Sequence, residues 1–231
     1  MVDTHIETAL RRKAGPAGAQ VEFVVRTELP LYQERLVKMG WQPEGRPGSF
    51  ARRLDDAPDI ESIFERFSRH IETMVRQSVR LEPIDWRRGL TELADRAEHS
   101  HLRWWLYGSG ALAVRGVPIE PGDLDVHVND PLLAGQLLAD HLVEPVTHLR
   151  GWVADAGGRA FVGVLIEWLA GAHPTGLDPP HEQDESVANH LELIPWHGHH
   201  IPVPRLEIQL AVAERMGLPD RVALIREAMR S

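Results

Sequence analysis

The sequence predicts a mixed α+β fold, in which a mixed sheet is flanked by helices and preceded by a small α+β module. Two patterns predict this class. Short segments with alternating or continuous apolar residues, typical of strands, lie between longer segments whose apolar residues recur at helical spacing. A segment around Leu81–Pro83 then divides the chain, whose 231 residues suffice for two small domains. We therefore expect a module of unknown role over residues 1–83 and a larger domain over residues 84–231.

The composition limits the classes of protein to which the chain can belong. Hydrophobic residues make up 43% of it and charged residues 26%, as in soluble globular proteins. Cysteine is absent, which excludes disulfides, thiolate catalysis and thiolate zinc sites. No apolar run is long enough to span a membrane, and the N-terminal residues lack the apolar core of a signal peptide. We expect no membrane partner and a cytoplasmic location.

The net charge of −9 comes from the second part of the chain. Residues 91–231 contain 10 basic residues, none of them lysine, against 20 Asp and Glu residues. Because an acidic surface repels a polyanionic backbone, general DNA or RNA binding is not expected. A cationic small molecule would be attracted instead.

The first 83 residues contain the segments of a small α+β module. Val21–Thr27 alternates apolar and polar residues as a strand does, and Pro30 suits the first turn of a helix that ends before Gly40. Ile60–Val79 has the pattern of a long amphipathic helix with Asp59 as its N-cap. The other expected elements are a helix at Met1–Lys13 and strands at Trp41–Arg46 and Ser49–Leu54.

Trp104–Asn129 is the stretch around which the second part is organised. An apolar strand, Trp104–Tyr107, breaks at Gly108 and Ser109, continues as a short helix, and is followed by a second strand at Leu124–Val128. The turn supplies backbone N–H groups and a hydroxyl at the start of a helix, which is a favourable position for a phosphate group.

Asp123 and Asp125 are the candidate metal ligands of this stretch. They alternate with apolar residues of the second strand, so both carboxylates face one side of the sheet. Two like charges side by side are unfavourable unless a cation lies between them. Mg²⁺ prefers carboxylate oxygens and keeps a substrate phosphate as a further ligand. The pair therefore indicates a metal-bound nucleotide, the alternative being a turn aspartate followed by a solvated one.

This stretch resembles the nucleotidyltransferase superfamily, the polymerase-beta-like group that includes aminoglycoside and lincosamide nucleotidyltransferases. The family pattern is an apolar strand, Gly-Ser or Gly-Gly, a spacer and Asp-x-Asp between apolar residues, here LYGS and DLDV. The resemblance implies a nucleotidyltransferase-like mixed sheet and an enzyme that moves a nucleoside monophosphate from a nucleoside triphosphate such as ATP to an acceptor hydroxyl, releasing pyrophosphate. It implies Mg²⁺ or Mn²⁺ at Asp123 and Asp125 and the triphosphate at Gly108 and Ser109. The acceptor would be a small molecule or a protein or tRNA end.

Glu167 is the candidate for a third acid. It is the one charged residue in the segment Phe161–Leu169, which we expect to form a β-hairpin with Gly151–Asp155 around a turn at Gly157–Gly158. A carboxylate in so apolar a strand needs a partner. The resemblance implies that Glu167 completes the metal site or acts as general base on the acceptor hydroxyl. The alternatives are a solvent-facing residue or a partner for Arg159.

Two observations concern the cations that would hold the triphosphate. Arg115 is a candidate nucleotide-binding residue, although a cation at a helix C-terminus is equally explained by the helix dipole. Many relatives carry a lysine on the helix after the last strand, whereas that helix here, LEIQLAVAERM, has Gln209 and Arg215. This departure supports the alternative of a non-catalytic nucleotide-binding or regulatory protein on the same fold.

A histidine-rich segment, Trp196–His200, suggests another kind of metal site. A hydrolase with zinc at His197, His199 and His200 is a rival function, but no HExxH pattern is present and a histidine-rich hairpin tip is the simpler interpretation. The remaining elements expected in order are helices at Asp85–His99, Pro131–His141, Arg205–Met216 and Asp220–Met229, and strands at Leu191–Ile194 and Ile201–Val203.

Overall fold

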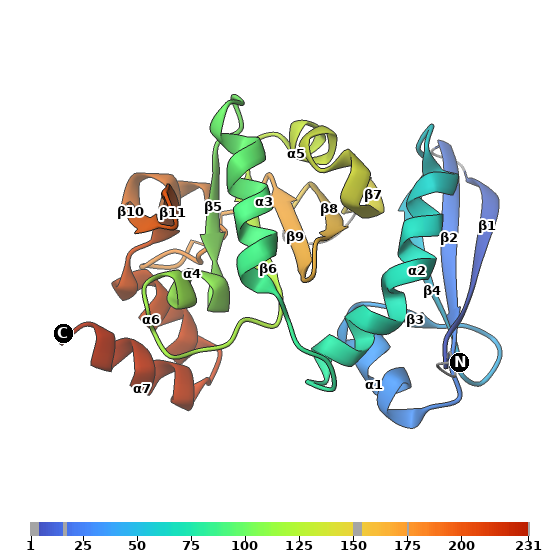
Figure 1. The fold of residues 1–231 in the computed structure, drawn as a ribbon, viewed down its shortest axis with the longest axis horizontal. Coiled ribbons are helices and arrows are strands. Elements are labelled where there is room, and N and C mark those ends of the chain that lie inside the picture. The colour runs from blue at the N-terminus through green and yellow to red at the C-terminus, as the bar shows by residue number, and fades with distance from the viewer. Residues whose placement is uncertain (1–4, 16–17, 150–153, 175, 231) are drawn as a thin grey trace.

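The computed structural model describes residues 5–15, 18–149, 154–174 and 176–230, and it confirms the predicted mixed α+β class (Figure 1). A mixed five-stranded sheet lies at the centre. A four-stranded antiparallel sheet with two helices lies on one side of it, and the C-terminal helices lie on the other side. The strand order of the central sheet is β5-β6-β9-β8-β7.

The N-terminal sheet has the order β1-β2-β4-β3. Its elements are β1 (Glu7–Gly15), β2 (Gly18–Arg26), β3 (Gln42–Pro43) and β4 (Ser49–Asp55), with helices α1 (Pro30–Lys38) and α2 (Ile60–Ser78). Phe64 and Phe67 of α2 pack on Phe23 of β2, each with its ring centroid 5.0 Å from the Phe23 ring. Asp59 directly precedes α2 as predicted, but its side chain makes no capping hydrogen bond.

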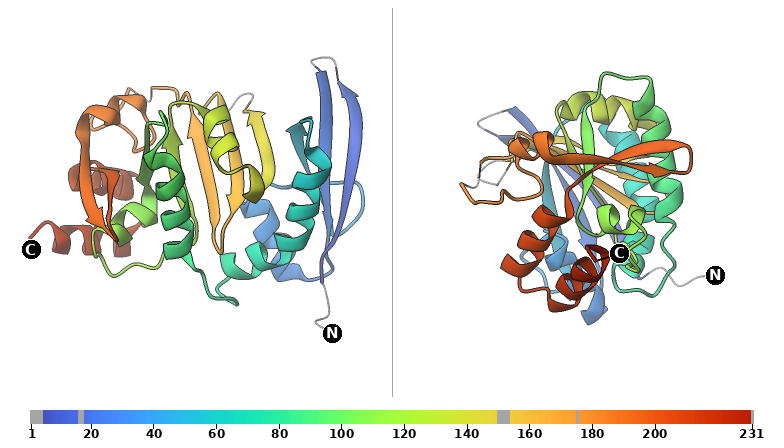
Figure 2. Two further views of the ribbon diagram at one scale, coloured as in Figure 1. Left: turned by 45° about the horizontal axis from the view of Figure 1, so that its top comes forward. Right: turned by 90° about the vertical axis from the view of Figure 1, so that its left-hand side faces the viewer.

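The central sheet brings two strands far apart in the sequence into direct contact. Its elements are β5 (Trp104–Tyr107), β6 (Leu124–Val128), β7 (Leu142–His148), β8 (Ala156–Phe161) and β9 (Leu165–Ala170). β6 and β9 run parallel, and the other neighbours are antiparallel. The helices around the sheet are α3 (Trp86–Glu98), α4 (Gly108–Val114) and α5 (Pro131–Leu137), with a 3₁₀ turn η1 (Ala139–His141). α3 and α5 lie over one face (Figures 1 and 2).

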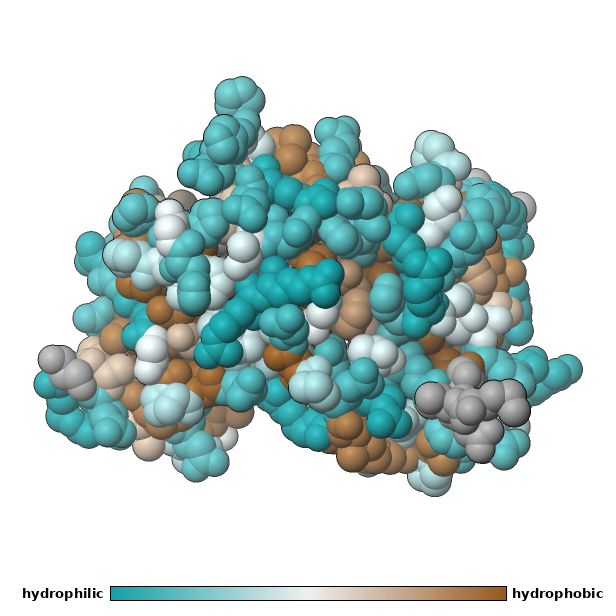
Figure 3. All heavy atoms as spheres, viewed as in Figure 1, coloured by the Kyte–Doolittle hydropathy of each residue, from teal (hydrophilic) through white to brown (hydrophobic). Residues whose placement is uncertain are grey.

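The C-terminal part consists of a hairpin and two helices. Its elements are η2 (Glu185–His190), β10 (Leu191–Trp196), β11 (His199–Pro204), α6 (Leu206–Arg215) and α7 (Pro219–Ala228). Within the described ranges, none of the helices is both long and apolar enough to cross a lipid bilayer. The face shown in Figure 3 is mostly hydrophilic, with apolar atoms in scattered patches rather than one broad surface.

The helix predicted at Met1–Lys13 is wrong over its described part, where the chain forms strand β1. Its alanine, leucine, arginine and lysine residues favour a helix when taken alone. β1 instead pairs with β2 along its whole length, so that Thr8 and Leu10 face inward while Glu7 and Ala9 are exposed. Pairing with a neighbouring strand overrides the local helix preference.

The hairpin turn predicted at Gly157–Gly158 is also wrong. Both glycines lie inside β8, and the turn to β9 is at residues 162–164, where Gly163 has a φ of +71°. Gly158 pairs directly with Trp168 of β9, whose indole ring occupies the space above it. The predicted arm Gly151–Asp155 falls mostly outside the described residues, and the strand that pairs with β8 on its other side is β7.

The N-terminal sheet is attached to the central sheet through α2 and β4. The Arg66 side chain of α2 donates from Nε to the Leu142 carbonyl of β7 at 2.8 Å. The His70 ring packs on Phe161 with the two centroids 4.8 Å apart. One continuous set of buried apolar side chains runs through both parts of the chain. The boundary at residue 83 stays a prediction.

Gly158→Ala should destabilise the protein by about 1–3 kcal/mol because it overpacks a closed region of the core. A Cβ at this position would lie 2.4 Å from Cζ2 of Trp168, a side chain that is 1% exposed. Urea unfolding followed by fluorescence measures the change. Gly122→Ala is the control, since its added Cβ would meet only the end of Arg80 at 3.8 Å. Equal stability of the two variants would contradict the prediction.

Candidate functional site

Asp123 and Asp125 lie at the start of β6. Asp125 is a strand residue, Asp123 directly precedes the strand, and both are half-buried. In the parallel pairing of β6 with β9, Asp125 stands opposite Glu167. Side chains of directly paired residues share one face of a sheet. The fold therefore brings Glu167 beside Asp125, and all three acids line one cleft of about 1060 Å³.

The three acids repel one another. Burial, followed by the charges of Asp123 and Glu167, raises the pKa of Asp125 well above its ordinary value. Burial and the charge of Glu167 also raise the pKa of Asp123, while Arg35 is the cation that opposes this rise most. Carboxylates in such mutual repulsion are stabilised by a cation between them.

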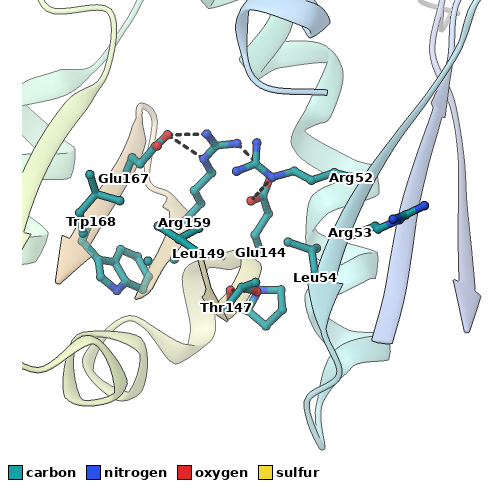
Figure 4. Close-up of a pocket in the computed structure, with 13 residues that line it drawn as sticks. Arg52, Arg53, Leu54, Glu144, Thr147, Leu149, Arg159, Glu167 and Trp168 are labelled. Carbon is teal, nitrogen blue, oxygen red and sulfur yellow. Dashed lines mark hydrogen bonds and ion pairs between the residues drawn. The ribbon is translucent and has the colours of Figure 1, made fainter. Parts of the chain in front are cut away.

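Glu167 is held by a buried ion-pair network (Figure 4). Arg159 of β8 donates to Oε2 of Glu167 from Nε at 2.7 Å and lies 2.6 Å from it through Nη2. The same guanidinium donates from Nη1 to Glu144 of β7 at 3.1 Å, and Arg52 of β4 binds the other oxygen of Glu144 at 2.9 Å. The predicted partnership of Glu167 with Arg159 is thus present, and the described bonds leave Oε1 of Glu167 unused.

The three acids do not converge on one point in this conformation. A metal site needs at least three ligand atoms close together. Among the described residues, the side chains that meet this condition, with ligand atoms within 4.8 Å of one another, are Asp95, Glu98 and His199. Asp123, Asp125 and Glu167 do not form such a group, and the Arg159 guanidinium occupies one oxygen of Glu167. Their side chains instead lie along the lining of one cleft.

The turn at Gly108 touches the acids directly. Gly108 begins α4 with a φ of +64°, a conformation that favours glycine. A Cβ at this position would lie 2.9 Å from Oδ2 of Asp125, so the backbone approaches the carboxylate as closely as the absence of a side chain permits. Ser109 follows and is half-buried. The structure thus places the predicted phosphate turn beside the predicted metal ligands.

Glu182 is a fourth acid that the sequence did not reveal. It is 5% exposed and accepts a hydrogen bond from Gln209 Nε2 at 3.0 Å. Burial raises its pKa, while Gln209, Arg221 and the Gly108 N–H oppose the rise. An anionic group of the protein therefore already lies close to this turn. Nothing in the polar segment around Glu182 distinguishes this residue from its neighbours.

The arginines differ in what they reach. Arg115 bonds to the Pro204 carbonyl at 2.8 Å and to Glu192 at 2.6 Å, which ties it to the β10–β11 hairpin. Arg215 donates to the carbonyls of Pro179 and Pro180. Arg221 of α7 is the cation whose charge acts on Asp125 and Glu182. Helix α6, which carries no lysine, is thus followed by a helix whose Arg221 opposes the rise in pKa of two of the acids.

Comparison with known proteins finds a similarity in the path of the backbone and none in the sequence. A crystal structure of a proposed nucleotidyltransferase from Thermotoga maritima superposes with a TM-score of 0.49 at 18% sequence identity, covering 64% of this chain and 96% of that one. No family model matches the sequence, and no curated protein does. At this identity the likeness is one of chain path.

The histidine-rich segment forms the tip of the β10–β11 hairpin. His197 lies in the turn with a φ of +47°, and His199 points to α3, with Nε2 3.2 Å from Asp95 and Nδ1 3.8 Å from Glu98. In the described part of the chain, His197, His199 and His200 do not form a common metal group. The geometry favours the hairpin interpretation over a three-histidine zinc site.

Proposed function

We propose that the chain is a metal-dependent nucleotidyltransferase, which moves a nucleoside monophosphate from a nucleoside triphosphate to an acceptor hydroxyl and releases pyrophosphate. One observation carries this proposal. Three carboxylates, Asp123, Asp125 and Glu167, line a single cleft beside the Gly108 turn and repel one another. Perturbed carboxylates of this kind gather at sites of function rather than at sites chosen for stability. The acceptor is a small molecule or a protein or tRNA end.

The donor set fits Mg²⁺ or Mn²⁺. Asp123, Asp125 and the unused Oε1 of Glu167 offer hard oxygen atoms only, and their repulsion requires a positive charge. A divalent ion bound there would neutralise charge on the phosphates during transfer. Arg159 would keep Glu167 oriented through the bonds to its other oxygen.

The transfer itself exchanges one bond for another. The acceptor oxygen bonds to the α-phosphorus, the bond from that phosphorus to the bridging oxygen of the β-phosphate breaks, and pyrophosphate leaves. Glu167 takes the proton of the acceptor hydroxyl as general base. Catalysis consists mostly of positioning and charge neutralisation, as in other phosphoryl-type transfers.

The triphosphate belongs on the Gly108 side of the acids. Glu182 already lies close to the Gly108 N–H and lowers its availability, so Ser109 and Arg221 are the groups we assign to the phosphates. Arg221 takes the part of the lysine that α6 lacks. Arg115 is bonded to the hairpin and is assigned a structural role.

Nucleotide binding gives the first test. We expect the melting temperature of the protein to rise when a nucleoside triphosphate and MgCl₂ are added. Binding raises the free energy of unfolding by RT ln(1 + [L]/Kd), which is about 2.7 kcal/mol at a hundredfold excess over Kd. Each of the four triphosphates is tested with and without metal. Incubation with α-labelled triphosphate and an acceptor panel then follows label transfer, with Asp123→Ala plus Asp125→Ala as control. Label transfer that survives this double change would remove the mechanism.

A non-catalytic nucleotide-binding protein is the second candidate. It is favoured by α6, whose Gln209 bonds to Glu182 and whose Arg215 bonds to two proline carbonyls, so that neither is free for a triphosphate. It predicts the metal-dependent melting shift without label transfer to any acceptor.

A further inference from the structure

The acids line only one side of the cleft. The opposite wall comes from residues 13–55 of the N-terminal module and carries five cations, Lys13, Arg35, Lys38, Arg52 and Arg53, against three acids, Glu22, Glu44 and Asp55. The acidic second part of the chain would attract a cationic acceptor if it formed the cleft alone. The first part, however, contributes an excess of positive charge to the same space.

Most of these cations are already paired within the protein. Glu22 binds Lys13 at 2.7 Å and Arg53 at 3.1 Å. Lys38 pairs with Glu34 at 2.6 Å, and Arg52 pairs with Glu144 at 2.9 Å. Their charges are offset locally, so they add little attraction for an incoming ligand.

Arg35 is different. Among the residues that the structure describes, no carboxylate forms an ion pair with its guanidinium, and its buried Nε has no hydrogen-bond partner. Arg35 lies on α1 and lines the same cleft as Asp123 and Asp125. A buried N–H donor without a partner is unfavourable, and an anion in the cleft would satisfy it.

Arg35 and Arg221 belong to different parts of the fold. Arg35 lines the cleft from helix α1 of the N-terminal module, whereas Arg221 lies on α7 and is not among the described residues that line the cleft. In a phosphoryl-type transfer the attacking and leaving oxygens lie roughly in line on opposite sides of the phosphorus. With pyrophosphate leaving on the Arg221 side, the acceptor approaches from the side of Arg35.

We propose that Arg35 binds an anionic group, a phosphate or a carboxylate, on a small-molecule acceptor, and that the N-terminal module is the acceptor-binding part of the protein. This inference rests on the proposed function of the acids. A guanidinium binds either anion through two parallel hydrogen bonds. The cleft of about 1060 Å³ has room for a nucleotide together with a small acceptor.

Anion binding is tested first on the metal-free protein. Calorimetric titration with inorganic phosphate, and separately with acetate, is carried out on the wild type, Arg35→Gln and Arg46→Gln. Arg46 is an exposed residue of the same module outside the cleft and serves as the matched control. We expect Arg35→Gln to weaken binding of the anion about 10-fold or more, while Arg46→Gln leaves it unchanged.

Acceptor preference is tested next with magnesium and nucleoside triphosphate. The acceptors are matched sets, such as glucose, glucose 6-phosphate, gluconate and glucosamine. We expect an anionic acceptor of the set to be preferred. Comparison of glucose 6-phosphate with gluconate then shows whether Arg35 binds a phosphate or a carboxylate group. Arg35→Gln should raise KM for that acceptor about 10-fold with little change in kcat, and Arg35→Lys should recover part of the loss.

Three results would overturn the inference. One is anion binding by Arg35→Gln that equals the wild type. Another is weaker binding of the magnesium–nucleotide complex in Arg35→Gln, which would assign Arg35 to the triphosphate. The third is better transfer to glucosamine than to any anionic acceptor. If the wild type binds no nucleotide, the proposed function fails, and the phosphate titration still decides whether Arg35 is an anion site.

Discussion

Asp125→Asn is expected to abolish nucleotidyl transfer and, at the same time, to make the metal-free protein more stable. Asparagine keeps the shape of the side chain but removes a partly buried charge that Asp123, Glu167 and Glu182 all repel. Relief of about 1 kcal/mol would raise the melting temperature by about 2–4 °C in a chain of this size. Loss of a metal-ligating charge should lower transfer on the order of 10³-fold or more.

Two measurements on the same variant check this. Label transfer reports activity, and the melting temperature is recorded without metal and with magnesium plus nucleotide. Asp59→Asn is the control, since Asp59 is exposed and its side chain makes no capping bond. It should change neither quantity. An Asp125→Asn protein that is less stable than the wild type without metal would show that the carboxylate serves the fold rather than a cation.

Gly108→Ala should lower transfer about 10²-fold, because its Cβ would lie 2.9 Å from Oδ2 of Asp125 and displace that carboxylate. The variant also carries a backbone penalty, since alanine at a φ of +64° costs about 1–2 kcal/mol.

Gly116→Ala separates the two effects. Gly116 has a φ of +85°, and an added Cβ there would meet nothing within 4 Å. Both variants should lose similar stability in denaturant unfolding, but only Gly108→Ala should lose activity when assayed well below its melting temperature. Equal activities would mean that the close approach of Gly108 to Asp125 has no role in transfer.

The motif region was predictable because its signals are local. The strands Trp104–Tyr107 and Leu124–Val128 lie where apolar runs and glycine breaks indicate them. The alternation of Asp123 and Asp125 around Leu124 fixes their common face from sequence spacing alone. Glu167 was identifiable because a single charge in an apolar strand needs a partner.

The remainder depends on contacts between segments far apart in the sequence. β1 consists of good helix formers and becomes a strand only through its pairing with β2. β7, which carries Glu144, contains a proline and has no regular alternation that would mark a strand. Glu182 and Arg35 lie in segments whose composition does not set them apart from their neighbours. Only the folded chain brings them near Asp123 and Asp125.

The alternating charges of Arg52, Glu144, Arg159 and Glu167 make the first part of the chain inseparable from the second. Removing one member of a buried ion pair leaves the other uncompensated, at about 3–5 kcal/mol. A protein shortened to residues 84–231 would lack Arg52, the partner of Glu144. Because Arg159 binds both Glu144 and Glu167, we expect its ion pair with Glu167 to be less well positioned. The isolated C-terminal part is thus not equivalent to the whole protein, because Glu167, the proposed general base, would no longer be held as it is in the intact chain.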